Sequence, residues 1–325
     1  MYNRKNIKKS ELVMNKIIER INQAKHIVVI AHLTPDADSL ASASAVYTYL
    51  LTLHKKVSFF CASKSINPKL LFLPWSEKIR DSFPSSADLA ISLDCGTRSR
   101  LGVELKCDLI NIDHHASNDK FGTFSLIDSK CISTTQVLYN FFKFNKISIN
   151  KKMATALYAG VLDDSNGFLS DEVDGTTFAL VQELIAAGAD FKLCNKYIMK
   201  YISLGAFRLK AIMHKNMCLL HNAKIAVFCV TQEDMKTSGA IGEDCESVLE
   251  ESLYLKSVEV ALLLRENPDF TLKGSLRSNT LLDVSKIASK FGGGGHTSRA
   301  GFVIEKPMTL EEAKIELLKL ISKEI

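Results

Sequence analysis

The stretch I-V-V-I-A-H-L-T-P-D-A-D-S, residues 27–39, joins an apolar run to a cluster of polar side chains. The β-branched run is typical of a buried strand in a parallel sheet, and it would end near Ile30. His32, Asp36 and Asp38 would then lie beyond the carboxyl end of that strand, where ligands bind in open α/β sheets. Such side chains repel one another and lose hydration unless a cation lies among them. The stretch therefore predicts a metal site at a strand end.

Further strands and helices alternate on either side of this stretch. Apolar runs at residues 57–61, 87–94 and 108–113 read as strands, whereas residues 11–24 and 39–53 have helical spacing. This alternation predicts an α/β fold in which a mostly parallel sheet has helices on both faces.

The pattern changes in the second half of the chain, where hairpins replace the alternation. We expect a catalytic dimetal domain over residues 1–195, a helical linker over 196–216 and a smaller α/β substrate-binding domain over 217–325. Two hairpins are predicted in the last domain, within residues 217–230 and 257–278. A cleft between the two domains is expected to hold the substrate.

Composition narrows the class of protein. The chain has 325 residues, of which 46% are apolar and 24% charged, as in soluble globular proteins of two domains. The net charge of +5 is compatible with an anionic substrate but does not require one. Neither a signal peptide nor an apolar run of membrane-spanning length is recognisable. Eight cysteines without a Cys-x-x-Cys pair favour reduced thiols over a structural zinc site and predict a cytoplasmic protein without a membrane partner.

Three more segments carry carboxylates and imidazoles. Asp94 ends a second apolar strand, I-N-I-D-H-H at residues 110–115 ends a third, and G-V-L-D-D-S at residues 160–165 supplies two aspartates. With the first stretch, they provide six candidate metal ligands, namely His32, Asp36, Asp38, Asp94, one of His114 and His115, and Asp164.

Six protein ligands exceed the three of a catalytic zinc site and suit two divalent cations that share a carboxylate. Ligation by aspartate and histidine without cysteine favours Mn²⁺, with Mg²⁺, Co²⁺ and Fe²⁺ as alternatives. Two metals about 3.5–4 Å apart are a recurring arrangement for hydrolysing phosphate esters. The ligand set therefore predicts a metal-dependent phosphohydrolase.

The order and spacing of these motifs resemble those of the DHH phosphoesterase superfamily. The motifs that carry the resemblance are H-x-x-P-D-x-D (32–38), the isolated Asp94, D-H-H (113–115) and G-V-L-D-D-S (160–165). K-G-S-L-R-S (273–278) and G-G-G-G-H (292–296) resemble the DHH-associated C-terminal domain. Over nearly all of its length the chain is similar to oligoribonucleases of the nanoRNase type that also act as pAp phosphatases.

The resemblance implies a role for each matching residue. One metal would be held by His32, Asp36 and Asp94, and the other by Asp38, Asp94, His114 and Asp164. His115 would face the scissile phosphate, with Asp113 as the partner that orients it. The residues implied to bind substrate are Arg100, Arg265, Lys273, Ser275, Arg277, Gly294, Gly295 and His296. Whether Asp163 or Arg299 contributes is left open by the sequence.

The resemblance also implies a reaction. The substrates would be short single-stranded RNA or DNA, or linear dinucleotides, cleaved to mononucleotides, and 3′-phosphoadenosine 5′-phosphate (pAp), cleaved to AMP. Hydrolysis of cyclic dinucleotides, of pyrophosphate or of polyphosphate is one alternative, and a nucleotide-binding regulator without catalysis is another. A homodimer is also left open. A general RNA-binding module is disfavoured, because the chain lacks a recognisable basic and aromatic platform.

Overall fold

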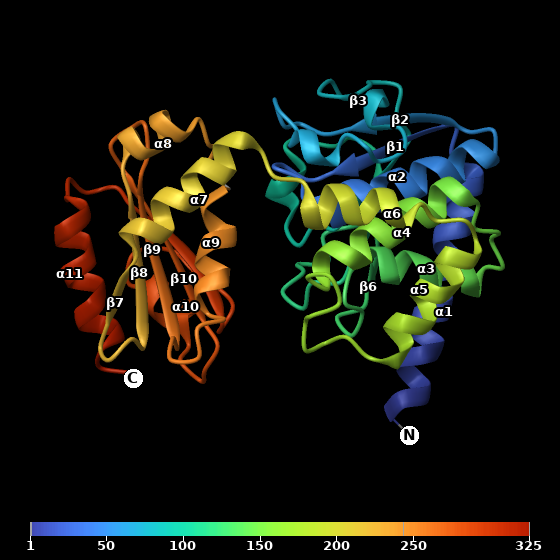
Figure 1. Ribbon diagram of the computed structural model, residues 1–325. Coiled ribbons are helices and arrows are strands. Elements are labelled where there is room, and N and C mark those ends of the chain that lie inside the picture. Colours follow the sequence, from blue (N-terminus) through green and yellow to red (C-terminus); the bar gives the residue numbers. More distant parts are fainter. Residues whose placement is uncertain (1, 243, 325) are drawn as a thin grey trace. The chain divides into compact units, whose positions relative to one another are not determined.

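The computed structural model describes residues 2–242 and 244–324, with side chains from Ser10 onward. The chain divides into two compact units, Met1–Tyr201 and Ile202–Ile325 (Figure 1). This division falls inside the segment 196–216 that the sequence analysis assigns to a linker. Most of that segment is the helix α7 (Leu204–Asn216), which belongs to the second unit.

The first unit is built around a parallel six-stranded sheet with the strand order β3-β2-β1-β4-β5-β6. Its strands are β1 (His26–Ala31), β2 (Lys56–Phe60), β3 (Ile79–Arg80), β4 (Leu89–Leu93), β5 (Asp108–Asp113) and β6 (Phe124–Ile127). The predicted strands are present, and β3 and β6 are two short edge strands that the sequence reading missed. The strand order reverses between β1 and β4, and ligands bind beyond the carboxyl ends of the strands at such a reversal.

Helices flank this sheet, which confirms the predicted fold class. They are α1 (Tyr2–Gln23), α2 (Ala37–Thr52), α3 (Thr134–Phe144), α4 (Lys151–Asp164), α5 (Gly175–Ala186) and α6 (Phe191–Cys194), followed by the π-helical turn η4 (Asn195–Lys200). Alternate residues of β1 serve the two faces of the sheet. Ile27 and Val29 pack against the long helices in the main core, whereas Val28 and Ile30 pack against loops and the short 3₁₀ helix η3 (Arg98–Leu101). Two further 3₁₀ turns are η1 (Pro68–Leu70) and η2 (Ser76–Lys78).

Helices α2 and α4 approach each other closely, and small residues permit the approach. Gly160 lies on α4, where a Cβ atom would come within 2.3 Å of Asp38 Oδ1 and 2.5 Å of Thr135 Oγ1. Ala41, Ala43 and Ala45 of α2 are fully buried. Because Asp38 is itself in the first turn of α2, the packing of these helices also fixes the position of a predicted metal ligand.

The second unit contains a mixed six-stranded sheet with the order β11-β12-β10-β9-β8-β7. Its strands are β7 (Cys218–Leu220), β8 (Ile225–Val230), β9 (Val260–Glu266), β10 (Leu272–Ser278), β11 (Gly294–Gly295) and β12 (Arg299–Ile304). The two predicted hairpins are confirmed as the antiparallel pairs β7–β8 and β9–β10, while β8 and β9 run parallel.

Helices cover both faces of the second sheet. They are α7, α8 (Gln232–Ser238), α9 (Asp244–Ser252), α10 (Val284–Ser289) and α11 (Leu310–Ile321). One hydrophobic core joins the sheet to α10 and α11, and another joins it to α7 and α9. The helices α8 and α9, which are short, were not predicted. Among the described helices of both units, none combines the length and apolarity needed to cross a membrane.

Candidate metal centre

All six predicted metal ligands lie at the carboxyl edge of the first sheet. His32, Asp94 and His114 directly follow β1, β4 and β5, while the other three aspartates belong to the beginning of α2 and the end of α4. Their ligand atoms form groups within which all atoms lie within 4.8 Å of one another. These groups are His32–Asp36–Asp94, Asp38–His114–Asp164 and Asp94–Asp113–His114–His115.

Asp94 lies between the first two groups and faces each with a different oxygen. Its Oδ2 is 3.5 Å from His32 Nε2, and its Oδ1 is 3.7 Å from His114 Nε2. Thr134 Oγ1 donates a hydrogen bond to the same Oδ1 at 2.9 Å. Asp94 has a φ of +56°, in the left-handed region that aspartate and asparagine adopt more readily than most residues. The two oxygens of Asp94 thus face two different histidines of the site.

The first group surrounds His32. Its Nε2 lies 3.7 Å from Asp36 Oδ2, and its Nδ1 is 2.8 Å from the Leu33 carbonyl oxygen. Burial would lower the pKa of His32, but the nearby carboxylates of Asp36 and Asp94 outweigh burial and raise this pKa to about 9. The surrounding carboxylates thus favour positive charge at this position, which a metal ion would supply.

The second group includes the fully buried Asp38. Its Oδ2 accepts from the Thr134 N–H at 2.7 Å, and its Oδ1 accepts from the Thr135 N–H at 3.1 Å and the Thr135 hydroxyl at 2.8 Å. These donors belong to the first turn of α3, whose amino terminus favours an anion. Burial and the neighbouring Asp94 nevertheless raise the pKa of Asp38 well above its ordinary value. The sequence reading missed both threonines, although S-T-T at 133–135 is a recognisable helix start.

Asp164 rather than Asp163 faces the second group. Asp164 Oδ2 lies 3.3 Å from His114 Nε2, whereas Asp163 Oδ2 accepts from the Ala37 backbone N–H at 3.3 Å. Burial and the surrounding aspartates raise the pKa of Asp164 well above its ordinary value. The structure thus gives Asp163 a contact to the start of α2.

His115 is oriented by Asp113 through a hydrogen bond of 2.7 Å between Nδ1 and Oδ1. Asn118 donates to the other carboxylate oxygen of Asp113 at 2.6 Å. The hydrogen bond that His115 donates to Asp113 is the main reason why the pKa of His115 is raised. Asn118, which the sequence reading missed, therefore supports the histidine indirectly, and Nε2 of His115 remains available to a ligand.

The donor set fits hard divalent cations. It consists of carboxylate oxygens and imidazole nitrogens, and no thiol belongs to any of the three groups. The raised pKa values of Asp38 and Asp164 indicate that it costs free energy to ionise all of these carboxylates when no cation lies among them. Positive charge placed among them would remove that penalty. The chemistry of the site therefore supports divalent metal binding, without selecting one ion.

We expect the metal-free protein to lose stability as the pH rises through the mildly acidic range. Folding raises the pKa of Asp38, Asp163 and Asp164. As the pH rises, the unfolded chain therefore releases these protons before the folded chain does, and the free energy of unfolding falls. For Asp163, whose pKa burial raises from 3.8 to about 6, the loss spans those two values. The measurement is the free energy of unfolding in EDTA at several pH values.

Repulsion between Asp164 and the neighbouring aspartates predicts the effect of a substitution. Asp164→Asn should raise the melting temperature of the metal-free protein at neutral pH, while reducing the increase that Mn²⁺ produces in the wild type. Thermal unfolding with EDTA and with Mn²⁺ measures both effects. An Asp164→Asn variant that melts lower in EDTA and gains as much from Mn²⁺ as the wild type would contradict this interpretation.

Arg100 lies beside the first group. Its Nη2 is 3.0 Å from His32 Nδ1 and 3.2 Å from His32 Nε2. Its backbone carbonyl accepts from the Leu33 N–H at 2.8 Å, which ties η3 to the loop after β1. The predicted substrate residue is therefore held at the edge of the metal centre, where its guanidinium would meet an anion.

The other predicted substrate residues lie in the second unit. Arg265 on β9 is paired in register with Lys273 on β10, and Ser275 and Arg277 follow on the same face of β10. Gly294 and Gly295 form β11, and the His296 N–H donates to the Arg299 carbonyl oxygen at 2.7 Å, closing the turn to β12. A Cβ atom on Gly295 would lie 2.3 Å from that carbonyl oxygen. The close approach of the Gly295 backbone to β12 is therefore enough to explain why a glycine stands here, and no ligand has to be invoked.

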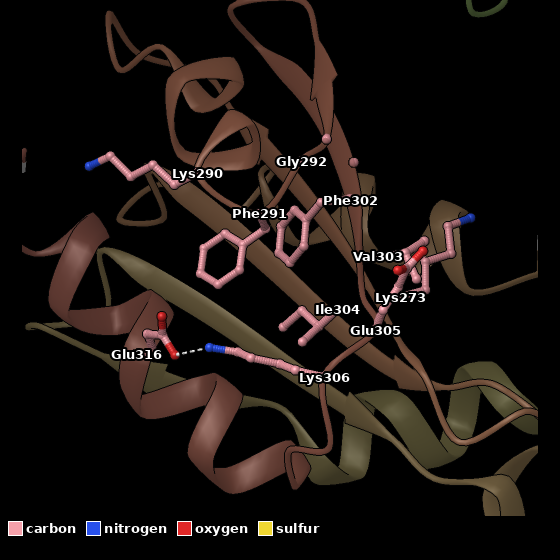
Figure 2. A pocket seen from close by; sticks show the side chains of 12 residues that line it. Lys273, Lys290, Phe291, Gly292, Phe302, Val303, Ile304, Glu305, Lys306 and Glu316 are labelled. Carbon is pink, nitrogen blue, oxygen red and sulfur yellow. Dashed lines mark ion pairs between the residues drawn. The ribbon is translucent and has the colours of Figure 1, made fainter.

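A surface hollow of about 770 Å³ wraps around β12 of the second unit (Figure 2). Phe291 and Phe302 stack in it with ring centroids 4.9 Å apart, and Lys306 pairs with Glu316 at 3.5 Å. Lys273 points away from the two rings in Figure 2. Of the predicted substrate residues, only Lys273 lines this hollow. The hollow therefore does not coincide with the predicted binding face.

Comparison with known proteins agrees with this geometry. The family model described as "DHH family, N-terminal domain" matches residues 26–161, and the model described as "DHHA1 domain" matches residues 222–325. The bifunctional oligoribonuclease and PAP phosphatase NrnA of Mycoplasma genitalium is 24% identical over 316 residues, covering 95% of this chain and 98% of that protein. NrnA of Thermus thermophilus is 27% identical over 305 residues, covering 92% of this chain and 90% of that protein.

Solved structures share the fold. An exopolyphosphatase-related protein from Bacteroides fragilis superposes with a TM-score of 0.87 at 23% identity, covering 96% of each chain. RecJ of Thermus thermophilus, solved in complex with Mn²⁺, has a TM-score of 0.59 at 15% identity, covering 97% of this chain and 55% of RecJ. The two family matches together span well over half of the sequence. The chain therefore carries a DHH family N-terminal domain followed by a DHHA1 domain.

Proposed function

We propose that this protein hydrolyses short single-stranded oligonucleotides and linear dinucleotides to mononucleotides, and pAp to AMP. Two relatives that are similar over nearly the whole chain are described as bifunctional oligoribonucleases and PAP phosphatases. We further propose that two divalent cations, Mn²⁺ in the first instance, serve the reaction. All eight cysteines are free, which supports a cytoplasmic location.

One observation carries the proposal. Asp94 directs its two oxygens toward two separate groups of ligand atoms, His32 with Asp36 on one side and Asp38, His114 and Asp164 on the other. A single cation needs no such division, whereas two cations that share a carboxylate do. When bound, the two cations would supply positive charge for the phosphoryl oxygens and lower the pKa of water.

The chain's own residues would do the remaining work. Asp113 accepts from Nδ1 of His115, so Nε2 is the atom that can meet the scissile phosphate. The raised pKa of His115 favours the protonated form, which donates a hydrogen bond to a phosphoryl oxygen. Arg100 would hold a second phosphoryl oxygen from the edge of the site. We assign binding of the rest of the nucleotide to the second unit, through the face of β9 and β10.

Incubation with Mn²⁺ and a panel of substrates tests the proposal. We expect release of mononucleotides from a linear dinucleotide and of AMP from pAp, with slower turnover of long RNA, cyclic dinucleotides and pyrophosphate. EDTA should stop the reaction, and Mn²⁺ should restore it. Preference for pyrophosphate or a cyclic dinucleotide would assign a different substrate, and tight pAp binding without product would identify a nucleotide-binding regulator.

A further inference from the structure

Two glutamates of α9 contact the cationic face of β10 in the second unit. Glu246 Oε1 accepts a hydrogen bond from the Ser275 hydroxyl at 2.9 Å, and its Oε2 accepts one from Arg277 Nη2 at 2.8 Å. Lys273 Nζ lies 3.5 Å from Glu246 Oε1. All three of the predicted substrate residues on β10 therefore contact one carboxylate of the protein itself.

Glu250, one helical turn further along α9, contacts the same face. Its Oε1 accepts from Arg277 Nε at 3.4 Å and lies 2.6 Å from Arg299 Nη2. The remaining nitrogen of Arg277, Nη1, donates to the Leu276 carbonyl oxygen at 3.0 Å. Each nitrogen of this guanidinium thus has a partner, and the side chain is only 11% exposed. Glu246 and Glu250 thus engage two of the five N–H groups of Arg277, and a phosphate that binds through those two groups must displace a glutamate.

We propose that Glu246 and Glu250 are specificity-determining residues that compete with substrate phosphate for the donors of Ser275, Arg277 and Arg299. The inference rests on the proposed function, because it names what limits binding at the second unit. A carboxylate and a phosphate offer a guanidinium the same kind of paired oxygen acceptors. Breaking these ion pairs therefore reduces the binding free energy that each phosphate gains.

The balance of charge on this face indicates which ligands it would favour. Arg265, Lys273, Arg277 and Arg299 supply four positive charges, and Glu246 and Glu250 neutralise two of them. A ligand with one or two phosphate groups suits the remaining charge. A long polyanion would gain more from a fully cationic face, because binding strength to nucleic acid rises with the number of phosphates neutralised. The glutamates would thus favour short substrates.

Glutamine substitutions test the competition. Glu246→Gln and Glu250→Gln keep the size of the side chain and remove its charge. We expect the double variant of the full chain to bind a fluorescent dinucleotide in EDTA about tenfold more tightly at low salt. Between about 50 and 200 mM salt, its affinity should fall more steeply than that of the wild type, because more of its binding free energy comes from attraction between charges that salt screens. In the Mn²⁺-dependent assay KM should fall while kcat stays within about twofold, since the reacting groups are untouched.

Glu251→Gln is the matched control. Glu251 follows Glu250 on the same helix, but its carboxylate contacts Lys210 and His214 of α7. This variant should leave the affinity and the salt slope unchanged. Thermal unfolding verifies that each variant folds, and Glu246→Asp, which withdraws the carboxylate by one methylene, provides a milder second variant with a smaller gain in affinity.

Weaker dinucleotide binding by the double variant, or an unchanged affinity and salt slope, would show that the glutamates position the cations or play no part. Either result overturns the inference. A wild-type protein that hydrolyses neither dinucleotides nor pAp contradicts the proposed function instead. The binding measurement in EDTA still decides the role of the two glutamates in that case, because it does not depend on turnover.

Discussion

Asp94→Asn is expected to lower kcat for dinucleotide hydrolysis by at least about 10³-fold, because the shared carboxylate loses its charge and one acceptor oxygen. The fold should persist. Asparagine adopts the left-handed backbone conformation of this position as readily as aspartate does, whereas alanine would add strain. Steady-state kinetics with Mn²⁺, together with circular dichroism and thermal unfolding, measures both expectations.

Asp108→Asn provides the control for this experiment. Asp108 starts β5, at the opposite edge of the sheet from the metal centre, and pairs with Arg20 at 2.8 Å. Because this pair is solvent-exposed, its loss should change the free energy of unfolding by less than about 1 kcal/mol and leave kcat unchanged. If Asp94→Asn kept more than a tenth of the wild-type activity, the shared role of Asp94 would be wrong.

Gly160→Ala is expected to destabilise the protein by about 3 kcal/mol and to remove most of its metal-dependent activity. The new Cβ atom would come within 2.3 Å of Asp38 Oδ1, and Asp38 is buried and fixed by three hydrogen bonds. Either α4 moves away from α2 or the carboxylate leaves its position. Denaturant unfolding and the Mn²⁺-dependent increase in melting temperature measure the two consequences.

Gly175→Ala is the matched substitution. Gly175 is the first residue of α5, and a Cβ atom there would have no heavy atom within 4 Å apart from its chain neighbours. Alanine should therefore stabilise the protein slightly, by up to about 1 kcal/mol, and leave activity unchanged. A Gly160→Ala variant as stable and active as Gly175→Ala would show that the helix contact tolerates the extra methyl group.

The parallel sheet, and the convergence of the predicted ligands at its carboxyl edge, could be predicted because both have local signals. A buried parallel strand appears as a continuous apolar run, and a polar side chain directly after it must lie at the carboxyl edge. His32, Asp94 and His114 follow this rule. Asp164 lies at the end of a helix instead, so family resemblance and register, rather than strand geometry, gave its prediction.

The contacts that hold these ligands could not be predicted in the same way. Asp38 is bound by Thr134 and Thr135, which follow it by 96 and 97 residues, and no local pattern specifies such a pairing. The glutamates of α9 were missed for another reason. Charged residues on a short helix usually face solvent, so the sequence gives no sign that Glu246 contacts a strand.

The dispersed origin of the metal ligands constrains the order of events during synthesis. Between His32 and Asp164 the ribosome must add the other five strands of the first sheet and the helices α2 to α4, so an early nascent chain lacks the donors to capture both ions. The set is complete before residue 202, where the second unit begins. Since amino-terminal domains generally fold first, the first unit can fold while the second unit is still being translated.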